Sequence, residues 1–290
     1  MEYTDLHNCI RKNGVVIFLD ALGVKNLDTE GSCEFIRKRG EFLKEVHYIR
    51  DERAKQFKKD LDIDLPDLDI ALFQDSIIIS WEDPEPKQKS ERYHFSFFQA
   101  AGQFLMDTIT EAIRHDLFFR GAISQGEYVV NISNKNVSII GPAVSDAADY
   151  FEIGDWVGVI QTPNFQEKYI SSLETLAEAD KTRLGLPITV DDVIDKYKFL
   201  FVRYIVPLSV KKIDLFSSKP DSLITSREFF VSSWPIMACM IESKIPISKI
   251  LFEKSITEKP EYQLKYFNSY QFLEWYKSQF WEDLKKRPGE

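Results

Sequence analysis

The sequence has few cysteines, no excess of basic charge and no long hydrophobic run. Its three cysteines among 290 residues, Cys9, Cys33 and Cys239, show neither a zinc-binding spacing nor a disulfide framework, which favours a reducing compartment. The net charge of −9 argues against broad binding to nucleic acid or anionic membranes. No apolar run reaches the length of a membrane span, and the first residues lack the apolar core of a signal peptide. We therefore expect a soluble, cytoplasmic protein that binds neither nucleic acid nor membrane.

The first half of the chain alternates strand-like apolar runs with amphipathic helical patterns. The expected elements are a strand at 15–19, a helix at 32–60, a hairpin at 70–79 with its turn at Gln74-Asp75, a loop at 82–92, a helix at 94–115, a strand at 117–130 with a turn at Gly126, its partner strand at 137–141 and a helix at 141–153. This order predicts an α+β fold with an antiparallel-rich sheet and helices on one face, close to the ferredoxin-like plan.

The second half of the chain is less regular. Its expected elements are a loop at 179–189, a strand at 198–210 in which Pro207 indicates an edge or a bulge, and partly helical segments at 226–241 and 263–284. We expect the strand to extend the sheet. Because no long polar linker divides the chain, we expect a core at 1–165 and a C-terminal α/β extension at 166–290, packed together as one continuous globular unit.

Two acids interrupt the apolar strands of the first half. Asp20 follows the run Val15–Leu19, and Asp75 stands at the tip of the next hairpin. Each alone is more often a turn or cap residue, but a carboxylate beside so much apolar surface is costly unless it is paired, hydrogen-bonded or metal-bound. A ferredoxin-like sheet would bring both acids to one end, where two carboxylates and nearby backbone carbonyls suit Mg²⁺ or Mn²⁺. The turn after Asp20 could offer its amides to phosphate.

Four segments in order resemble the motifs of class III nucleotidyl cyclases. "FLDALGV" resembles their first metal motif, and "FQDSIII" resembles the second, with Gln74 in place of a glycine. "RGAISQGEYVV" is similar to their Arg-x-Gly-x-x-x-Gly strand, and "SIIGPAVSDAADYFE" lies where the family has Gly-x-x-Val-Asn-x-Ala-x-Arg. The resemblance covers roughly residues 13–155, and it implies the ferredoxin-like catalytic fold of that family.

Some positions depart from the family pattern. The transition-state asparagine of the family falls on Ser145 and its arginine on Asp149, and the pair that selects a purine falls on Ala71 and Ser138. The loss of the purine-selecting pair resembles the bacterial pyrimidine cyclases of antiphage (Pycsar) systems, which make cyclic UMP or cyclic CMP. A cyclase acting on ATP or GTP, and an inactive cyclase-fold domain that binds nucleotide or a partner, remain as alternatives.

The resemblance implies a two-metal reaction in which the ribose 3′-OH attacks the α-phosphorus and pyrophosphate leaves. Asp20, Asp75 and the backbone carbonyl of Ala21 would hold two Mg²⁺ or Mn²⁺ ions, and Ser145 would bind the ribose or the reacting phosphate. Arg120 or Lys25 could replace the missing arginine, although a strand-end ion pair suits Arg120 equally well. The residues expected to contact substrate are Ala21, Leu22, Gly23, Val24, Lys25, Ala71 and Ser138.

Two kinds of partner follow from the same resemblance. Class III catalytic domains resemble one another in forming head-to-tail dimers whose sites are built from two chains, so we expect a homodimer with sites at its interface. The substrate would be a pyrimidine nucleoside triphosphate, and the cyclic product would need a separate cyclic-nucleotide-sensing effector protein.

Overall fold

The computed structural model describes residues 9–25, 27–62, 64–83, 93–133, 136–185, 187–209 and 226–281. The elements of the first half are β1 (Cys9–Ala21), α1 (Thr29–Leu61), β2 (Leu68–Phe73), β3 (Ser76–Glu82), α2 (Tyr93–Arg114), β4 (Phe119–Ser133), β5 (Asn136–Ile140) and α3 (Pro142–Tyr150). Those of the second half are β6 (Gly158–Gln161), α4 (Pro163–Leu184), α5 (Val190–Tyr197), β7 (Phe201–Pro207), β8 (Ser226–Ser232), α7 (Pro235–Ile241), α8 (Ile247–Thr257), α9 (Pro260–Tyr276) and a π-helical turn at Lys277–Trp281.

The first four strands form a ferredoxin-like βαββαβ unit. They lie in the order β2-β3-β1-β4, and each neighbouring pair is antiparallel. β5 adds to β4 as a hairpin, and the sheet then continues through β6, β8 and β7. The fold class predicted from the sequence is therefore confirmed: an α+β molecule around an antiparallel-rich sheet, with one parallel pair between β4 and β6.

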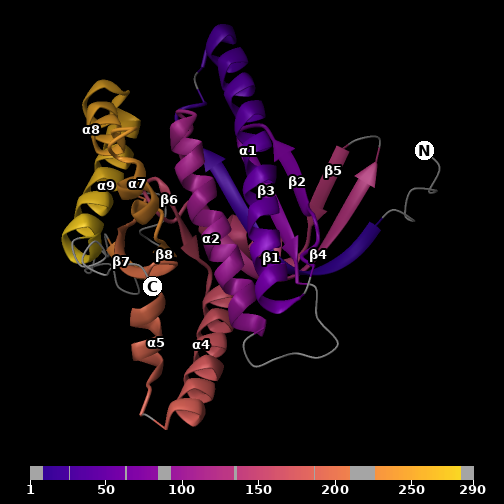
Figure 1. The fold of residues 1–290 in the computed structure, drawn as a ribbon. Helices are drawn as coiled ribbons and strands as arrows, with labels where there is room; N and C mark the ends of the chain where they lie inside the picture. Colours follow the sequence, from indigo (N-terminus) through magenta and orange to yellow (C-terminus); the bar gives the residue numbers. More distant parts are fainter. Residues whose placement is uncertain are drawn as a thin grey trace, which may run out of the picture.

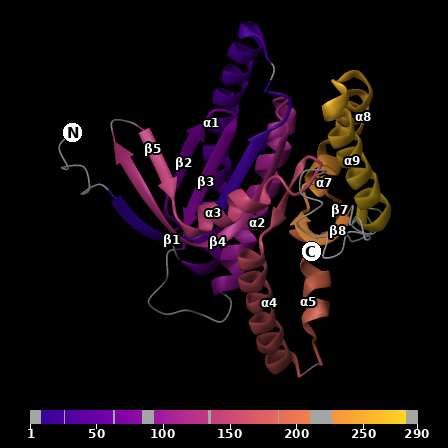
Figure 2. The same cartoon turned by 180° about the vertical axis from the view of Figure 1, so that it is seen from behind.

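Helices α1 and α2 cover one face of this sheet (Figure 1). Phe42 of α1 packs against Phe119 with ring centroids 5.6 Å apart, and Trp81 of β3 meets Phe104 of α2 at 5.4 Å. The short helix α3 lies on the opposite face, as the view from behind shows (Figure 2). There Phe18 of β1 stacks on the residue that follows α3, Phe151, at 4.7 Å. The prediction of helices on one face therefore holds for α1 and α2 and is wrong for α3, which packs on the other face.

Helix α1 begins and ends at clear capping signals. The side chain of Asp28 accepts a hydrogen bond from the Gly31 amide at 2.8 Å, which satisfies a donor that the first turn leaves unpaired. At the other end Asp62 adopts a left-handed backbone with φ of 57°. The helices predicted at 32–60 and 94–115 are therefore confirmed as α1 and α2. Of the loop predicted at 82–92, residues 84–92 lie outside the described ranges.

The turn predicted at Gly126 is wrong, because β4 runs through it without interruption. Gly126 pairs with Gly14 of β1 and has a φ of +154°, a value that side chains other than glycine rarely adopt. Ala143 of α3 packs over it, 3.7 Å from the position that a Cβ would take. Glycine here keeps the strand paired and lets α3 approach, and no reversal of the chain follows.

Two further predictions in the second half are wrong in part. Residues 179–184, expected in a loop, form the last turns of α4, where the pairs Glu178–Lys181 and Asp180–Arg183 lie three residues apart on the helix. The helix ends at Gly185, which has a φ of 65°. Residues 226–232, expected to be partly helical, form strand β8 between β6 and β7; only the part at 235–241 is helical.

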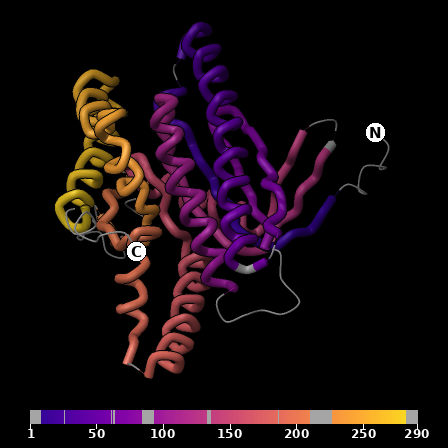
Figure 3. Tube along the Cα trace, viewed as in Figure 1, coloured from indigo at the N-terminus to yellow at the C-terminus, as the bar shows by residue number. Residues whose placement is uncertain are grey.

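The C-terminal half extends the sheet, as the strand prediction at 198–210 required. β7 is the edge strand, and Pro207 ends it, where a missing amide removes no central hydrogen bond. Helices α7, α8 and α9 gather at that end of the molecule, and the β4–β5 hairpin projects from the other end (Figure 3). Among the described residues, no helix is both long and apolar enough to cross a bilayer.

Candidate functional site

Asp20 and Asp75 lie together at one end of the sheet. Asp20 is the penultimate residue of β1 and pairs in register with Ser76 of β3, so the turn between β2 and β3 stands beside it. The amide of Ala21 donates a hydrogen bond to the carbonyl oxygen of Asp75 at 3.1 Å. The strand end and the hairpin tip are thereby held together, and both carboxylates face the same pocket.

The hairpin turn has an unusual backbone at Gln74. Its φ is +52°, a left-handed value at the first central position of a two-residue turn, where glycine is favoured. Arg39 of α1 donates a hydrogen bond to the Gln74 carbonyl. The cyclase motif that "FQDSIII" resembles has glycine where this chain has Gln74. The positive φ gives the physical reason, because glycine adopts it without a steric cost. Here the contact from α1 holds the turn that carries Asp75.

Asp20 is a largely buried carboxylate with two partners, its side chain 14% exposed. Its Oδ1 accepts a hydrogen bond from the Ser76 hydroxyl at 3.3 Å, and its Oδ2 accepts one from Arg120 Nε at 3.0 Å. Arg120 also pairs with Glu152 at 3.2 Å. Burial raises the pKa of Asp20 above its ordinary value; Arg120 and Ser76 oppose this shift, and the nearby charge of Asp75 adds to it. Ionising Asp20 is therefore unfavourable, and a second cation beside its carboxylate would stabilise the charged form.

The turn after Asp20 offers fewer free amides than the sequence predicts. The Ala21 amide is bonded to Asp75, and the Leu22 amide donates to the Phe118 carbonyl at 2.7 Å. Gly23, Val24 and Lys25 remain as candidates for binding phosphate. Gly23 has a φ of +83°, and its missing Cβ would stand 3.9 Å from the hydroxyl of Tyr266. This turn therefore lies against the C-terminal helix α9.

These groups surround a pocket of about 550 Å³, a size in the usual range for small-molecule sites. Its lining includes every turn residue from Ala21 to Lys25, both aspartates and Arg120. The remaining lining residues are Glu152, Asp155, Ser209, Glu261, Tyr262 and Lys265. Five acids face three basic residues, so two negative charges are uncompensated. An excess of acids suits a divalent cation.

The donor set fits Mg²⁺ or Mn²⁺ shared with a phosphorylated ligand. Asp20 and Asp75 supply two carboxylates, and within the described part of the chain no group of three or more metal-binding side chains exists. Mg²⁺ is typically bound by one or two carboxylates and completed by water and substrate phosphates, so a pair is sufficient. Arg120 already contacts Oδ2 of Asp20, so a cation there must share or displace that contact.

Three of the predicted residues do not line this pocket. Ala71 is buried in β2, opposite Ile78 of the neighbouring strand. Ser138 is exposed on β5, and Ser145 is exposed on α3. Both serines lie at the surface and outside this pocket. Their roles stay predictions.

Several pocket residues were not predicted from the sequence. Glu152 and Asp155 follow α3 directly, and acids near the end of the last motif were the one available signal. Glu261, Tyr262 and Lys265 come from α9, far along the chain. No sequence signal marks them, because a helical pattern does not say which neighbour a helix will meet.

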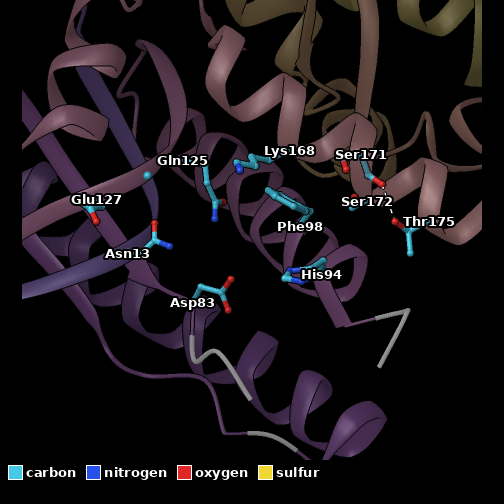
Figure 4. A pocket seen from close by; sticks show the side chains of 11 residues that line it. Asn13, Asp83, His94, Phe98, Gln125, Glu127, Lys168, Ser171, Ser172 and Thr175 are labelled. Atoms are coloured by element: carbon cyan, nitrogen blue, oxygen red, sulfur yellow. Dashed lines mark hydrogen bonds between the residues drawn. The ribbon is translucent and has the colours of Figure 1, made fainter. Parts of the chain in front are cut away.

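A second pocket, of about 460 Å³, lies between the middle of the sheet and α4 (Figure 4). Its two acids are both engaged elsewhere: Glu127 pairs with Arg11 at 2.6 Å, and Asp83 accepts the hydrogen bond of the Tyr93 hydroxyl. Most of its other labelled side chains come from α4 and α2: Lys168, Ser171, Ser172 and Thr175 from the former, and His94 and Phe98 from the latter. It lacks the adjacent carboxylates of the first pocket, which remains the stronger candidate.

Comparison with known proteins adds structural neighbours but no sequence relatives. No protein-family model and no curated protein match the sequence. The guanylyl cyclase domain of the RhoGC fusion protein from the aquatic fungus Blastocladiella emersonii is 12% identical, with a TM-score of 0.40, and the match covers 77% of this chain and 96% of that one. The catalytic core of a rhodopsin-guanylyl cyclase with converted specificity, in complex with ATPαS, is 11% identical, with a TM-score of 0.39 and coverages of 78% and 99%. The adenylyl cyclase CyaB from P. aeruginosa is 15% identical, with a TM-score of 0.37 and coverages of 77% and 95%. At such scores the function has to be argued from the side chains themselves.

Proposed function

We propose that this chain is a nucleotidyl cyclase, converting a nucleoside triphosphate to a 3′,5′-cyclic monophosphate and pyrophosphate. One observation carries the proposal: two aspartates from separate strands of a ferredoxin-like sheet meet at one pocket, beside a glycine turn. The four ordered motifs that resemble class III cyclases, two of which contain these aspartates, support the same conclusion. In the reaction the bond between the ribose 3′-oxygen and the α-phosphorus forms, the bond from that phosphorus to the bridging oxygen breaks, and the hydroxyl proton passes to solvent.

The residues of the pocket divide between two tasks. Asp20 and Asp75, with the Ala21 carbonyl, would hold two Mg²⁺ or Mn²⁺ ions, whose chemistry when bound is to make the ribose hydroxyl more acidic and to neutralise phosphate charge. The amides of Gly23 to Lys25 would hold the outer phosphates. Arg120 orients the Asp20 carboxylate through its bond at 3.0 Å and opposes the rise in the Asp20 pKa that burial causes.

The narrower proposal is that the substrate is UTP or CTP. Its support is that Ala71 and Ser138 stand where similar enzymes carry the pair that selects a purine, and neither side chain can read a purine edge in the usual way. Cyclic UMP or cyclic CMP made here would act through a separate effector protein, and the Pycsar resemblance suggests a role in antiphage defence. ATP or GTP remains the competing substrate class.

We also propose that the chain works as a homodimer. Ser145 is exposed on α3 and lies outside the pocket of its own chain, so its predicted contact with substrate needs a second subunit. The β4–β5 hairpin supports this arrangement, because Ile132 and Ile140 are 49% and 66% exposed there. Such apolar side chains are more favourable at an interface than in water.

The test is an assay for product with each nucleotide. Purified protein is incubated with ATP, GTP, CTP or UTP and Mn²⁺, and cyclic monophosphates are identified by mass spectrometry. Asp20→Asn and Asp75→Asn should abolish product. Asp51→Asn, an exposed acid on α1, should not change it. Absence of product from all four nucleotides would overturn the enzyme proposal, and product from purine nucleotides alone would overturn only the pyrimidine assignment.

A further inference from the structure

The C-terminal helix α9 forms one wall of the pocket that holds Asp20 and Asp75. Glu261, Tyr262 and Lys265 line that wall. Residues three and four apart share one side of a helix, so Lys265 lies on the same side as the other two. This wall belongs to the region beyond the motifs that resemble cyclases, and the proposed function assigns it no task.

Helix α9 is fixed against the core by contacts next to the pocket. Ser269 is fully buried, and its hydroxyl oxygen accepts a hydrogen bond from the Val157 amide at 2.7 Å. The ring of Tyr266 meets Phe118 edge to face at 5.1 Å. Asn268 donates a hydrogen bond to the Asp155 carbonyl at 2.7 Å. A helix held by such buried contacts has a defined position, so its pocket-facing side chains are part of a built surface.

Lys265 and Tyr262 supply a cation and an aromatic ring to this surface. The Lys265 side chain is only 16% exposed, and its Nζ lies 3.9 Å from Oδ1 of Asp155 and 5.6 Å from the centre of the Tyr262 ring. A separation of 3.9 Å is an ion pair without a direct hydrogen bond. The Lys265 ammonium group therefore lies beside Asp155 and the Tyr262 ring at the wall of the pocket.

The pocket has two other cations, Arg120 and Lys25. Arg120 is bonded to Asp20 and to Glu152. Lys25 is exposed on the turn itself. Lys265 lines the same pocket as the two aspartates that would hold the metal ions. A triphosphate bound to those ions would bring negative charge into the pocket that Lys265 lines.

We propose that α9 adds a wall to the part of the substrate site that this chain itself supplies, with Lys265 binding the phosphates of the nucleoside triphosphate and Tyr262 packing against its ribose or base. This inference rests on the proposed function and adds residues to the same site. It gives the C-terminal extension a direct role in substrate binding, and Lys265 takes the place of the arginine that Asp149 has replaced.

The test measures binding apart from turnover. Two probes are titrated into the full chain with Mn²⁺ by calorimetry: inorganic tripolyphosphate, which carries only the phosphates, and 3′-deoxynucleoside triphosphates, which lack the attacking hydroxyl. Lys265→Met should weaken both by about 10- to 100-fold, the usual loss for a hydrogen bond to a charged group. Lys265→Arg should bind close to wild type. Tyr262→Ala should weaken only the deoxynucleotides.

Controls separate a lost contact from a damaged fold. Lys249→Met removes an exposed lysine on the neighbouring helix α8 and should leave both affinities unchanged. Thermal melting of each variant checks the fold, and the recovery in Lys265→Arg shows that the charge is responsible. Unchanged tripolyphosphate binding in Lys265→Met would overturn the inference, and so would tighter binding, because it would mean that α9 obstructs the pocket.

The same set of variants distinguishes this inference from the proposed function. If Asp20→Asn abolishes cyclic product while Lys265→Met keeps wild-type affinities, the cyclase proposal stands and the role of α9 is wrong. If the wild type makes no cyclic product but binds tripolyphosphate through Lys265, the pocket binds phosphates and the cyclase proposal is wrong.

Discussion

The burial of Asp20 makes a sharp prediction about metal binding and stability. A cation that binds only the folded chain at a hundred times its Kd raises the free energy of unfolding by ~2.7 kcal/mol. The entropy of unfolding is ~2.1 cal/mol/K for each of the 290 residues, or ~0.6 kcal/mol/K in all. Mn²⁺ should therefore raise the Tm of the wild type by about 4 °C. Asp20→Asn should remove most of this rise, because it takes away one of only two carboxylates.

Scanning calorimetry at rising MnCl₂ and constant ionic strength measures the effect without any nucleotide. Asp107→Asn is the matched control, since Asp107 is also a largely buried acid whose pKa burial raises and which pairs with an arginine, Arg53. That variant has no part in the pocket and should keep the full response to Mn²⁺. An equal rise in Asp20→Asn and wild type would refute the reasoning, as would a response lost in both variants.

Four other outcomes can be measured. Burial raises the pKa of Asp20 above 3.8, so the folded chain holds this proton more tightly than the unfolded chain; the stability it contributes at lower pH is lost as pH rises through the raised pKa. Urea unfolding without metal should show a weaker decline with pH in Asp20→Asn, and parallel curves would contradict this. Gln74→Gly should gain about 1 kcal/mol in urea unfolding by relieving the left-handed backbone, with activity kept; a loss of stability would count against that reading. Phe104→Ala should lose ~3–5 kcal/mol, because the ring is fully buried against Trp81; a loss below 1 kcal/mol would show a loosely packed core. In an equal mixture of inactive Asp20→Asn and Ser145→Ala chains, roughly a quarter of wild-type activity should return if sites combine two subunits, and none should return if each site is built from one chain.

The ferredoxin-like core could be predicted from the sequence because its signals are local. Alternating apolar runs, a two-residue turn at Gln74-Asp75 and helical periodicity at 32–60 each determine structure within a few residues. Gly126 misled the same reasoning, since glycine serves both at turns and inside strands that need a special φ. Likewise, β8 shows no clean alternation, because Phe229, Phe230 and Val231 are all buried between two strands and the helices.

The candidate site could be predicted only where its residues lie inside motifs. Asp20 and Asp75 interrupt apolar strands, and that local anomaly is visible in the sequence. Lys265 is an ordinary lysine in a polar stretch, and its place beside Asp155 depends on how α9 docks after the whole sheet has formed. Long-range packing of this kind leaves no local pattern, so the pocket's second wall appears only in three dimensions.

The ion pair between Arg120 and Asp20 has a consequence for the order of binding events. A guanidinium already contacts Oδ2 of Asp20, so a metal ion bound there as proposed would have to share or displace that contact. Glu152, already bonded to the same guanidinium, lets Arg120 keep a partner during the exchange. In the absence of a metal ion, Arg120 therefore supplies the positive charge beside the Asp20 carboxylate. Such an exchange would favour a metal that arrives already bound to the substrate phosphates, because the phosphates could pair with the Arg120 guanidinium that the metal displaces.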